Sequence, residues 1–383
     1  MDPPVISRRE ALRLGLLAAS GGLLLGCAPR LAPRGVHPAP LGLRVEGGRL
    51  HLPRVHVSED RIVRTVAGLR PFRPGGFVVS AERQDGKLLV HNYGHGGGGI
   101  SLAWGSSELA VEEVRASGLA PGEAAVLGCG VMGLTTARLL QDRGWTVTIY
   151  ARDLPPYTTS NVAGGQWSPF SVHSAGSTTP AYDAQFAQAA RLSHARYQRM
   201  VGDGYGVRWV PNCVLSQTPQ GGDRGALEGL FPGETVFGPG EHPFATPYLR
   251  VFHSLFVEPG VFLAALQRDF HLRGGRVEVR EFHHLDEVHG LPQGVVVNCT
   301  GLGSRTLFGD EELVPVRGQV VHLLPQPEVD YILLGPGGHM FPRRDGIFLG
   351  GTNERDVWSL EPDPEMVQGL VERHREIFSG MAW

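Results

Sequence analysis

The chain of 383 residues has few cysteines and little net charge, and both shortages exclude classes of protein. A formal net charge of -3, without a lysine- or arginine-rich face, argues against a nucleic-acid-binding protein. The cysteines are too few and too scattered for a disulfide framework. They are Cys27, Cys129, Cys213 and Cys299. The histidines lack metal-ligand spacing, so we expect no metal site. The chain has no internal repeat, and its length suits one large α/β domain or two closely joined ones.

An apolar run near the N-terminus, residues 14–25, is too short and too glycine-rich to indicate a membrane-spanning helix. Ser7-Arg8-Arg9 before it resembles a twin-arginine export motif, and Leu24-Leu25-Gly26-Cys27 resembles a lipoprotein cleavage box. We therefore expect residues 1–27 to be an export signal and Cys27 to be lipidated, which would hold the protein at the membrane on the periplasmic or extracellular face. An uncleaved anchor is the alternative. Residues 28–43 are expected to form a proline-rich tether.

Residues 124–150 have the pattern of a strand, a glycine-rich turn, a helix and a second strand. The turn reads Gly128-Cys129-Gly130-Val131-Met132-Gly133. In such a unit the first glycine permits the tight turn, the second lets the backbone approach a pyrophosphate, and the third lets helix and strand pack closely. The helix N-terminus offers unpaired N–H groups to the phosphates. We predict a dinucleotide site here; turn glycines without a ligand are the alternative.

Two later segments are predicted to contact the same nucleotide. Arg152 and Asp153 follow the second strand, where a group that faces the adenosine ribose is expected. Residues 158–169 carry small and hydroxyl side chains against which a flat ligand can lie. The candidates there are Thr158, Thr159, Ser160, Gly164, Gly165 and Gln166.

A second glycine-rich loop precedes the dinucleotide unit. It reads Gly94-His95-Gly96-Gly97-Gly98-Gly99 and lies between a predicted strand, residues 87–91, and a predicted helix, residues 107–114. A flexible linker is the alternative, but the flanking segments are apolar. We predict another group of N–H donors at a helix N-terminus. Further upstream, residues 68–74 are bounded by two prolines and are predicted to form a stiff turn.

The remainder of the chain is predicted to alternate between strands and helices. Further strands are predicted at residues 77–80, 206–215, 249–258, 276–281, 314–324, 331–334 and 347–350, and helices at residues 180–200, 260–272 and 364–378. Residues 295–297 are all valine, which is typical of a central parallel strand buried on both faces.

Together these motifs resemble the D-amino-acid oxidase family of FAD enzymes. The matching stretches are VLGCGVMGL, IYARDLPPYTTSNVAGGQW, VVNCTG, VRGQ, GLRPFRP and HNYGHGGGGISLAWG. The resemblance implies an α/β fold, a Rossmann-like FAD domain interleaved with a mixed-sheet substrate domain. In the family, however, the last two stretches come at the C-terminal end, whereas here they precede the dinucleotide motif. The resemblance therefore implies a circular permutation, which closely spaced termini permit.

The domain boundaries follow from this order. Residues 44–117 are the permuted segment, residues 118–170 the FAD-binding core, and residues 171–290 mainly the substrate domain. Residues 291–383 are expected to contribute one strand to the FAD domain and further strands to the substrate domain, and to end in a helix.

The resemblance also implies roles for single residues. Arg70 matches the arginine that grips the substrate carboxylate, and Arg73 is left as a surface arginine. Gly97 would offer its carbonyl to the substrate amine. The loop around it would cradle the flavin N1/C2=O edge through Gly96, Gly98, Gly99, Ile100 and Ser101. His95 is expected to be structural, so the FAD is expected to be non-covalent.

Three positions depart from the family pattern. His339 stands where better-known members place a tyrosine against the substrate, and Gln166 and Ser168 replace an apolar residue and a glutamine. The implied reaction converts a D-amino acid, O₂ and water to a 2-oxo acid, ammonia and H₂O₂, with hydride transfer from Cα to flavin N5. The alternatives are a glycine or secondary-amine oxidase, a membrane-linked dehydrogenase and an amino-acid-binding lipoprotein. The oligomeric state stays open.

Overall fold

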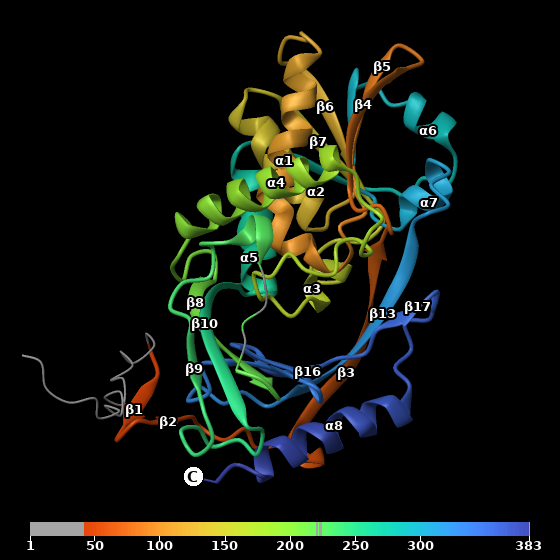
Figure 1. The fold of residues 1–383 in the computed structure, drawn as a ribbon. Coiled ribbons are helices and arrows are strands. Elements are labelled where there is room, and N and C mark those ends of the chain that lie inside the picture. Colours follow the sequence, from red (N-terminus) through yellow and green to blue (C-terminus); the bar gives the residue numbers. More distant parts are fainter. Residues whose placement is uncertain (1–41, 220, 222–223, 383) are drawn as a thin grey trace, which may run out of the picture. The chain divides into compact units, whose positions relative to one another are not determined.

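The structure, a computed structural model, describes residues 42–382 except 220, 222 and 223. The predicted export signal and nearly all of the tether lie outside the described residues. The described chain forms two large sheets with helices packed on them, which confirms the predicted α/β class (Figure 1). Among these residues no helix is long and apolar enough to cross a membrane.

A six-stranded sheet carries the dinucleotide motif. Its strands, in spatial order, are β11 (Arg276–Val279), β7 (Thr146–Ala151), β6 (Glu123–Leu127), β12 (Val295–Asn298), β5 (Lys87–Tyr93) and β4 (Val78–Gln84). The first five are parallel, and β4 pairs antiparallel with β5. As predicted, β12 is buried and lies between two parallel neighbours. The valine run suits this place because both faces of the strand are covered.

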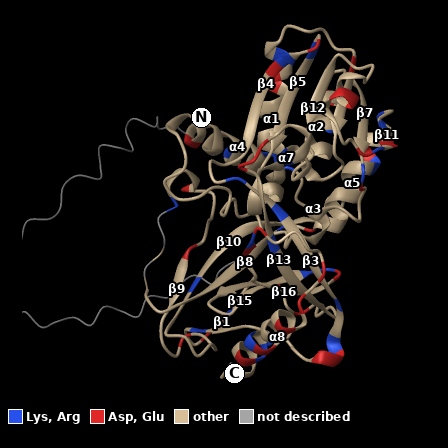
Figure 2. Ribbon diagram, turned by 90° about the vertical axis from the view of Figure 1, so that its right-hand side faces the viewer, with Lys and Arg blue, Asp and Glu red and all other residues tan. Residues whose placement is uncertain are grey.

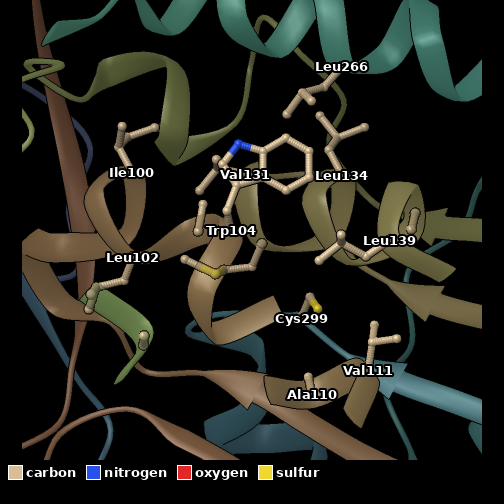
Figure 3. Close-up of a cluster of buried hydrophobic side chains, with 14 of the residues drawn as sticks. Ile100, Leu102, Trp104, Ala110, Val111, Val131, Leu134, Leu139, Leu266 and Cys299 are labelled. Atoms are coloured by element: carbon tan, nitrogen blue, oxygen red, sulfur yellow. The ribbon is translucent and has the colours of Figure 1, made fainter. Parts of the chain in front are cut away.

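Helices cover both faces of this sheet. One face packs on α1 (Gly99–Ala116), α2 (Val131–Asp142), α4 (Pro180–Gln198) and α5 (Pro259–Leu272). The other face packs on the short helices α6 (Leu285–His289) and α7 (Gly303–Leu307). Figure 3 shows how Trp104 of α1 packs among Val131 and Leu134 of α2 and Leu266 of α5. This apolar contact fixes the two glycine-rich turns relative to each other, because each turn leads into one of the first two helices.

A nine-stranded mixed sheet makes up the second layer. Eight strands run in the order β17 (Glu354–Arg355), β13 (Val314–Leu323), β16 (Gly346–Gly350), β15 (Gly338–Arg343), β14 (Ile332–Gly335), β8 (Val207–Ser216), β10 (Tyr248–Val257) and β9 (Thr235–Phe237). The ninth strand, β3 (Ile62–Phe72), pairs with β13. Helix α8 (Pro364–Ser379) covers one face of the sheet, and the short α3 (Thr159–Val162) lies near β3 on the other face. A small hairpin, β1 (Arg44–Glu46) with β2 (Arg49–His51), forms a separate two-stranded sheet, and its Leu50 is buried in the core that α8 makes with the nine-stranded sheet.

The turn predicted at residues 68–74 is wrong, because residues 68–72 belong to β3. Pro71 faces Pro315 of β13 in the antiparallel register. Opposite residues in such a pair alternate between hydrogen-bonded and non-hydrogen-bonded positions, and two residues without an N–H group fit the second kind. The helix predicted over residues 107–114 is also longer than expected, since α1 begins at Gly99.

The residues before the dinucleotide motif belong to both layers. β3 enters the nine-stranded sheet, whereas β4, β5 and α1 complete the six-stranded sheet and its helical cover. The described residues form one compact unit. Residues 62–116 are therefore not an independent domain. In Figure 2 the basic and acidic positions, blue and red, are interspersed along the ribbon.

Candidate flavin and substrate site

The carboxyl ends of the parallel strands meet at one edge of the six-stranded sheet. Asn298 at the end of β12 pairs in register with Leu127 of β6 and with His91 of β5. The turn after Leu127, the residues after Asn298 and the glycine loop after β5 therefore leave the sheet side by side. In parallel sheets this edge is where ligands bind.

The first glycine turn is packed so tightly that larger residues do not fit. Gly128 has φ +104°, and a Cβ there would lie 2.5 Å from the Cys299 carbonyl oxygen. A Cβ on Gly133 would overlap the Gly128 carbonyl, so helix and strand approach as closely as the motif predicts. A Cβ on Gly130 would have only the Ser160 hydroxyl near it, at 3.2 Å, so the backbone there is open to a ligand.

The N-terminus of α2 faces α3. The Val131 N–H donates to Ser160 Oγ at 3.0 Å, while Met132 and Gly133 complete the first helical turn. Such first-turn N–H groups have no acceptor within the helix. Thr158 donates to Asn161 within the same short segment, and Thr159 is exposed. Of the hydroxyl candidates, Ser160 is the one that the structure brings to the glycine turn.

The next three candidates, Gly164, Gly165 and Gln166, contact residues of the nine-stranded sheet. A Cβ on Gly164 would overlap the ring of Phe341, and one on Gly165 would lie 2.5 Å from the Val257 carbonyl oxygen. The Gln166 amide donates to Asn212 Oδ1, and Asn212 in turn donates to Ser254 Oγ at 2.9 Å. This buried polar chain was not predicted, although an asparagine within the apolar β8 was a usable signal.

Arg152 and Asp153 lie at the surface past the end of β7. They pair with each other at 2.8 Å, and Arg152 also pairs with Glu281 at 3.2 Å. Hydrogen bonds to these two carboxylates raise the pKa of Arg152. The two residues predicted to face the adenosine ribose are thus part of an ion-pair network, and Asp153 is not a free carboxylate.

The second glycine loop differs in part from its prediction. The Gly97 N–H donates to the Ser171 carbonyl at 3.0 Å, and the Gly98 N–H donates to the His95 carbonyl at 2.9 Å. A Cβ on Gly96 would lie 2.6 Å from the Ser171 carbonyl oxygen. These two N–H groups are therefore bonded within the protein and do not face a ligand. The first turn of α1 carries the remaining candidates, which are Gly99, Ile100 and Ser101.

His95 is part of the core under this loop. Its ring stacks on Phe77, with centroids 4.8 Å apart and planes 8° apart, and burial lowers its pKa to about 3. The ring is therefore neutral at ordinary pH, in agreement with the structural role predicted for it.

Arg70 is a partly buried cation without a counter-ion among the described residues. Its guanidinium lies directly over Gly318 of β13, where a Cβ would overlap it. It donates to the Thr352 carbonyl at 3.4 Å, and burial lowers its pKa. In the part of the chain that the structure describes, no carboxylate forms an ion pair with it. An arginine held this way is suited to bind an anionic ligand.

Arg73 has the opposite surroundings. It pairs with Asp310 at 2.7 Å and with Glu312 at 3.1 Å, and Tyr93 donates to the same Asp310 at 2.8 Å. Asp310 hydrogen bonding and the two carboxylate charges raise the pKa of Arg73, in spite of its burial. The structure therefore separates the two arginines of the GLRPFRP stretch: Arg73 has its counter-ions and Arg70 does not.

His339 lies on the same face of the sheet as Arg70. Its ring lies over Gly350, as Arg70 lies over Gly318. Because Val320 pairs with Gly350, these glycines are diagonal neighbours, with backbones roughly 7–8 Å apart. Burial, then the charges of Arg70 and His374, lower the pKa of His339 to about 3. A cation and a neutral imidazole thus lie on one face of the sheet, in the space that the two glycines leave free of side chains. Neither Gly318 nor Gly350 was predicted as a site residue.

The described residues contain no group of three histidine, cysteine or acidic side chains that could hold a metal ion. The donor set instead fits a dinucleotide. The bare backbone of Gly130, the first turn of α2 and Ser160 would match a pyrophosphate.

The family profile described as FAD dependent oxidoreductase matches residues 123–382. The chain belongs to this family. It is therefore a FAD-dependent oxidoreductase, as the resemblance implies. It is 34% identical over 259 residues to a D-amino-acid oxidase of Streptomyces coelicolor, a match that covers 66% of this chain and 76% of that one. It is 30% identical over 257 residues to a human D-aspartate oxidase, covering 65% and 74%.

The fold has a counterpart among solved structures. A glycine oxidase from Geobacillus kaustophilus superposes with a TM-score of 0.51 at 18% identity, covering 68% of this chain and 80% of that one. At this identity the likeness shows the FAD-dependent oxidase fold, and the substrate has to be argued from the site.

Proposed function

We propose that this FAD-dependent oxidoreductase oxidises D-amino acids with O₂ to 2-oxo acids, ammonia and H₂O₂. The observation that carries the proposal is the Arg70 guanidinium, which lies partly buried over Gly318 and has no counter-ion among the described residues. A carboxylate bound there offsets the cost of burying the charge. Relatives named D-amino-acid oxidase, at 34% and 32% identity, support the choice of substrate class.

Each residue of the site then has one task. Arg70 binds the substrate carboxylate with two parallel N–H groups, and neutral His339 orients it without adding a second positive charge. The Gly97 carbonyl accepts a hydrogen bond from the substrate amine. Bound FAD supplies the two-electron acceptor for the hydride that leaves Cα. The turns at Gly128 and Gly99 hold the cofactor, so the protein contributes orientation and charge rather than a nucleophile.

The test is a substrate panel on purified holoenzyme. We expect a yellow protein that consumes O₂ and releases H₂O₂ with D-amino acids and not with their L-enantiomers. Turnover of glycine or sarcosine in preference to all D-amino acids would instead support the glycine or secondary-amine oxidase. Flavin reduction without O₂ consumption indicates a dehydrogenase, and a colourless protein that binds amino acids indicates a binding lipoprotein.

We also infer that the chain is a circular permutation of its family. Two observations support this. The family profile begins at residue 123, directly at β6, while β3, β4, β5 and α1 come from residues 62–116 and still fill both layers. Only residues 117–122 connect α1 with β6. Moving residues 44–117 behind Trp383 with a short linker should preserve FAD content and activity; an unfolded or flavin-free product contradicts the permutation.

The location of the protein is a further proposal, since its evidence lies outside the described residues. Ser7-Arg8-Arg9 and the Leu24 to Cys27 box support twin-arginine export and a lipidated Cys27 that associates with the membrane. Cells expressing wild type and Arg8→Lys/Arg9→Lys should be fractionated. We expect processed wild-type protein in the membrane fraction and the unprocessed variant in the cytosol. Unprocessed wild-type protein in the cytosol refutes the proposal.

A further inference from the structure

The short helix α3 lies between the helical layer and the nine-stranded sheet and contacts both (Figure 1). On one side, the Ser160 hydroxyl accepts a hydrogen bond from the Val131 N–H of α2 at 3.0 Å. On the other side, Val162 packs on Gly68 of β3, where a Cβ would lie 3.1 Å from Val162 Cγ1. Helix α3 is thus an element through which the nine-stranded sheet reaches the glycine turn before α2.

Helix α3 has only four residues, so few of its backbone groups are bonded within the helix. The Asn161 N–H donates to the Thr158 carbonyl at 3.0 Å, and the Ala163 N–H donates to the Ser160 carbonyl at 3.4 Å. The carbonyls at the C-terminal end of a helix have no donor within it. Arg343 of β15 supplies one, because its Nη1 donates to the Ala163 carbonyl at 2.9 Å and to the Asn161 carbonyl at 3.3 Å. A side chain of the nine-stranded sheet therefore holds this end of α3 by its backbone.

Arg343 is fixed in one orientation by its other contacts. Its Nε and Nη2 donate to the two carboxylate oxygens of Asp345, at 2.8 and 2.7 Å. The guanidinium carbon lies 5.5 Å from the centroid of the Phe348 ring, and the residue is buried. One edge of the planar fork pairs with Asp345, which leaves Nη1 directed at α3. The next residue, Arg344, differs from it: its side chain is half exposed and pairs with Asp203 at 2.6 Å.

We propose that Arg343 is a positioning residue for FAD. By holding α3 it keeps the Ser160 hydroxyl at the glycine turn, and so it sets the affinity for the cofactor through α3 rather than by a contact of its own. A cofactor that binds next to a loose α3 must first order this segment, and the entropy lost in doing so lowers the affinity. The inference concerns the FAD site alone, so it stands apart from the proposed oxidation of D-amino acids.

The first test is a titration of the apoprotein with FAD, followed by protein and flavin fluorescence. Arg343→Gln should raise the Kd for FAD by roughly tenfold to a hundredfold, because α3 then has to be ordered on binding. Arg343→Lys keeps the charge but not the planar fork, so it should recover part of this loss and still bind at least about threefold more weakly than wild type. The matched control Arg344→Gln should bind FAD like wild type. An unchanged Kd in Arg343→Gln, even with a lower Tm, leaves Arg343 a purely structural role and overturns the inference.

A double-mutant cycle with Ser160→Ala tests the route of the effect. If Arg343 acts through Ser160, Arg343→Gln should raise the Kd for FAD less than about threefold in the Ser160→Ala background, because the group that Arg343 positions is already gone. An effect of full size in that background means that Arg343 acts by another route, and it overturns the inference as well.

Circular dichroism of each apoprotein shows whether the variants fold. We expect Arg343→Gln to fold, because the Asp345 side chain is 48% exposed and stays solvated when its partner is removed. If Arg343→Gln does not fold, Arg343→Lys takes its place in the titration and in the cycle. A Kd for FAD equal to that of wild type in Arg343→Lys then overturns the inference.

Discussion

Replacing each arginine of the GLRPFRP stretch in turn should separate catalysis from stability. Arg70 has no carboxylate partner among the described residues, and its guanidinium donates one long hydrogen bond there, to the Thr352 carbonyl at 3.4 Å. Two charge-assisted hydrogen bonds to a substrate carboxylate contribute about 1.5–3 kcal/mol each. Their loss amounts to roughly 10³-fold in kcat/KM, at about 1.4 kcal/mol per factor of ten. Arg70→Ala should show this loss and keep its FAD.

The same substitution should not weaken the fold. Removing Arg70 deletes a partly buried charge without a counter-ion among the described residues, so Tm should stay level or rise. Arg73→Ala is the reverse case, because it leaves Asp310, 9% exposed, without its cation and with the Tyr93 hydroxyl and the Glu312 N–H as hydrogen-bond donors. We expect a loss of about 2 kcal/mol in the free energy of unfolding, since Arg73 is itself partly exposed, and a small change in kcat/KM.

Both variants should be compared with wild type by steady-state kinetics, flavin absorbance and thermal melting. The expected pattern is crossed: Arg70→Ala loses activity at unchanged Tm, and Arg73→Ala loses Tm at nearly unchanged activity. If Arg73→Ala is the more damaging to kcat/KM while Arg70→Ala is mild, the carboxylate has been assigned to the wrong arginine.

Three further outcomes follow from the same geometry. Gly318→Ala should imitate Arg70→Ala in kcat/KM with normal FAD content and Tm, because the new methyl group displaces the guanidinium; normal kinetics would contradict this. Gly133→Ala should yield little folded flavoprotein, as seen by absorbance and circular dichroism, because its Cβ overlaps the Gly128 carbonyl. Tm should fall as pH decreases from 7 to 5. Three buried histidines have pKa values below the ordinary 6.5, so the unfolded chain binds more protons than the folded one in this range. They are His95 and His339, at about 3, and His322, at about 4. A Tm that does not change with pH would contradict this reasoning.

The elements with strong local patterns were predictable from the sequence. The valine run at β12 and the strand, turn and helix around Gly128 were found where expected, because burial on both faces and tight turns leave clear residue patterns. β15 was missed, since its proline and arginine hide an alternation that only its pairing with β16 reveals. The second half of β3, residues 68–72, was mistaken for a turn for a similar reason, because facing prolines are acceptable only once the register is known.

The parts of the site that were missed depend on contacts across long stretches of chain. Gly318 and Gly350 carry no local signal for function, and their role is visible only when Arg70 and His339 are seen lying over them. The Gly97 and Gly98 N–H groups were predicted to face a ligand, but Ser171 and His95 accept their hydrogen bonds. A run of glycines shows that the backbone is closely approached, and it does not show by what.

The charge balance of the nine-stranded sheet links these observations. Where Arg73 lies, Asp310 and Glu312 compensate it, so that end of β3 is stable without a ligand. Where Arg70 lies, the sheet offers two glycines, a carbonyl oxygen and a histidine that burial keeps neutral. Arg152 and Arg73 each have two ion pairs with acidic side chains. If Arg70 served stability alone, we would expect an acidic side chain beside it as well. This difference between Arg73 and Arg70 is the reason for proposing that a substrate carboxylate supplies the missing negative charge at Arg70.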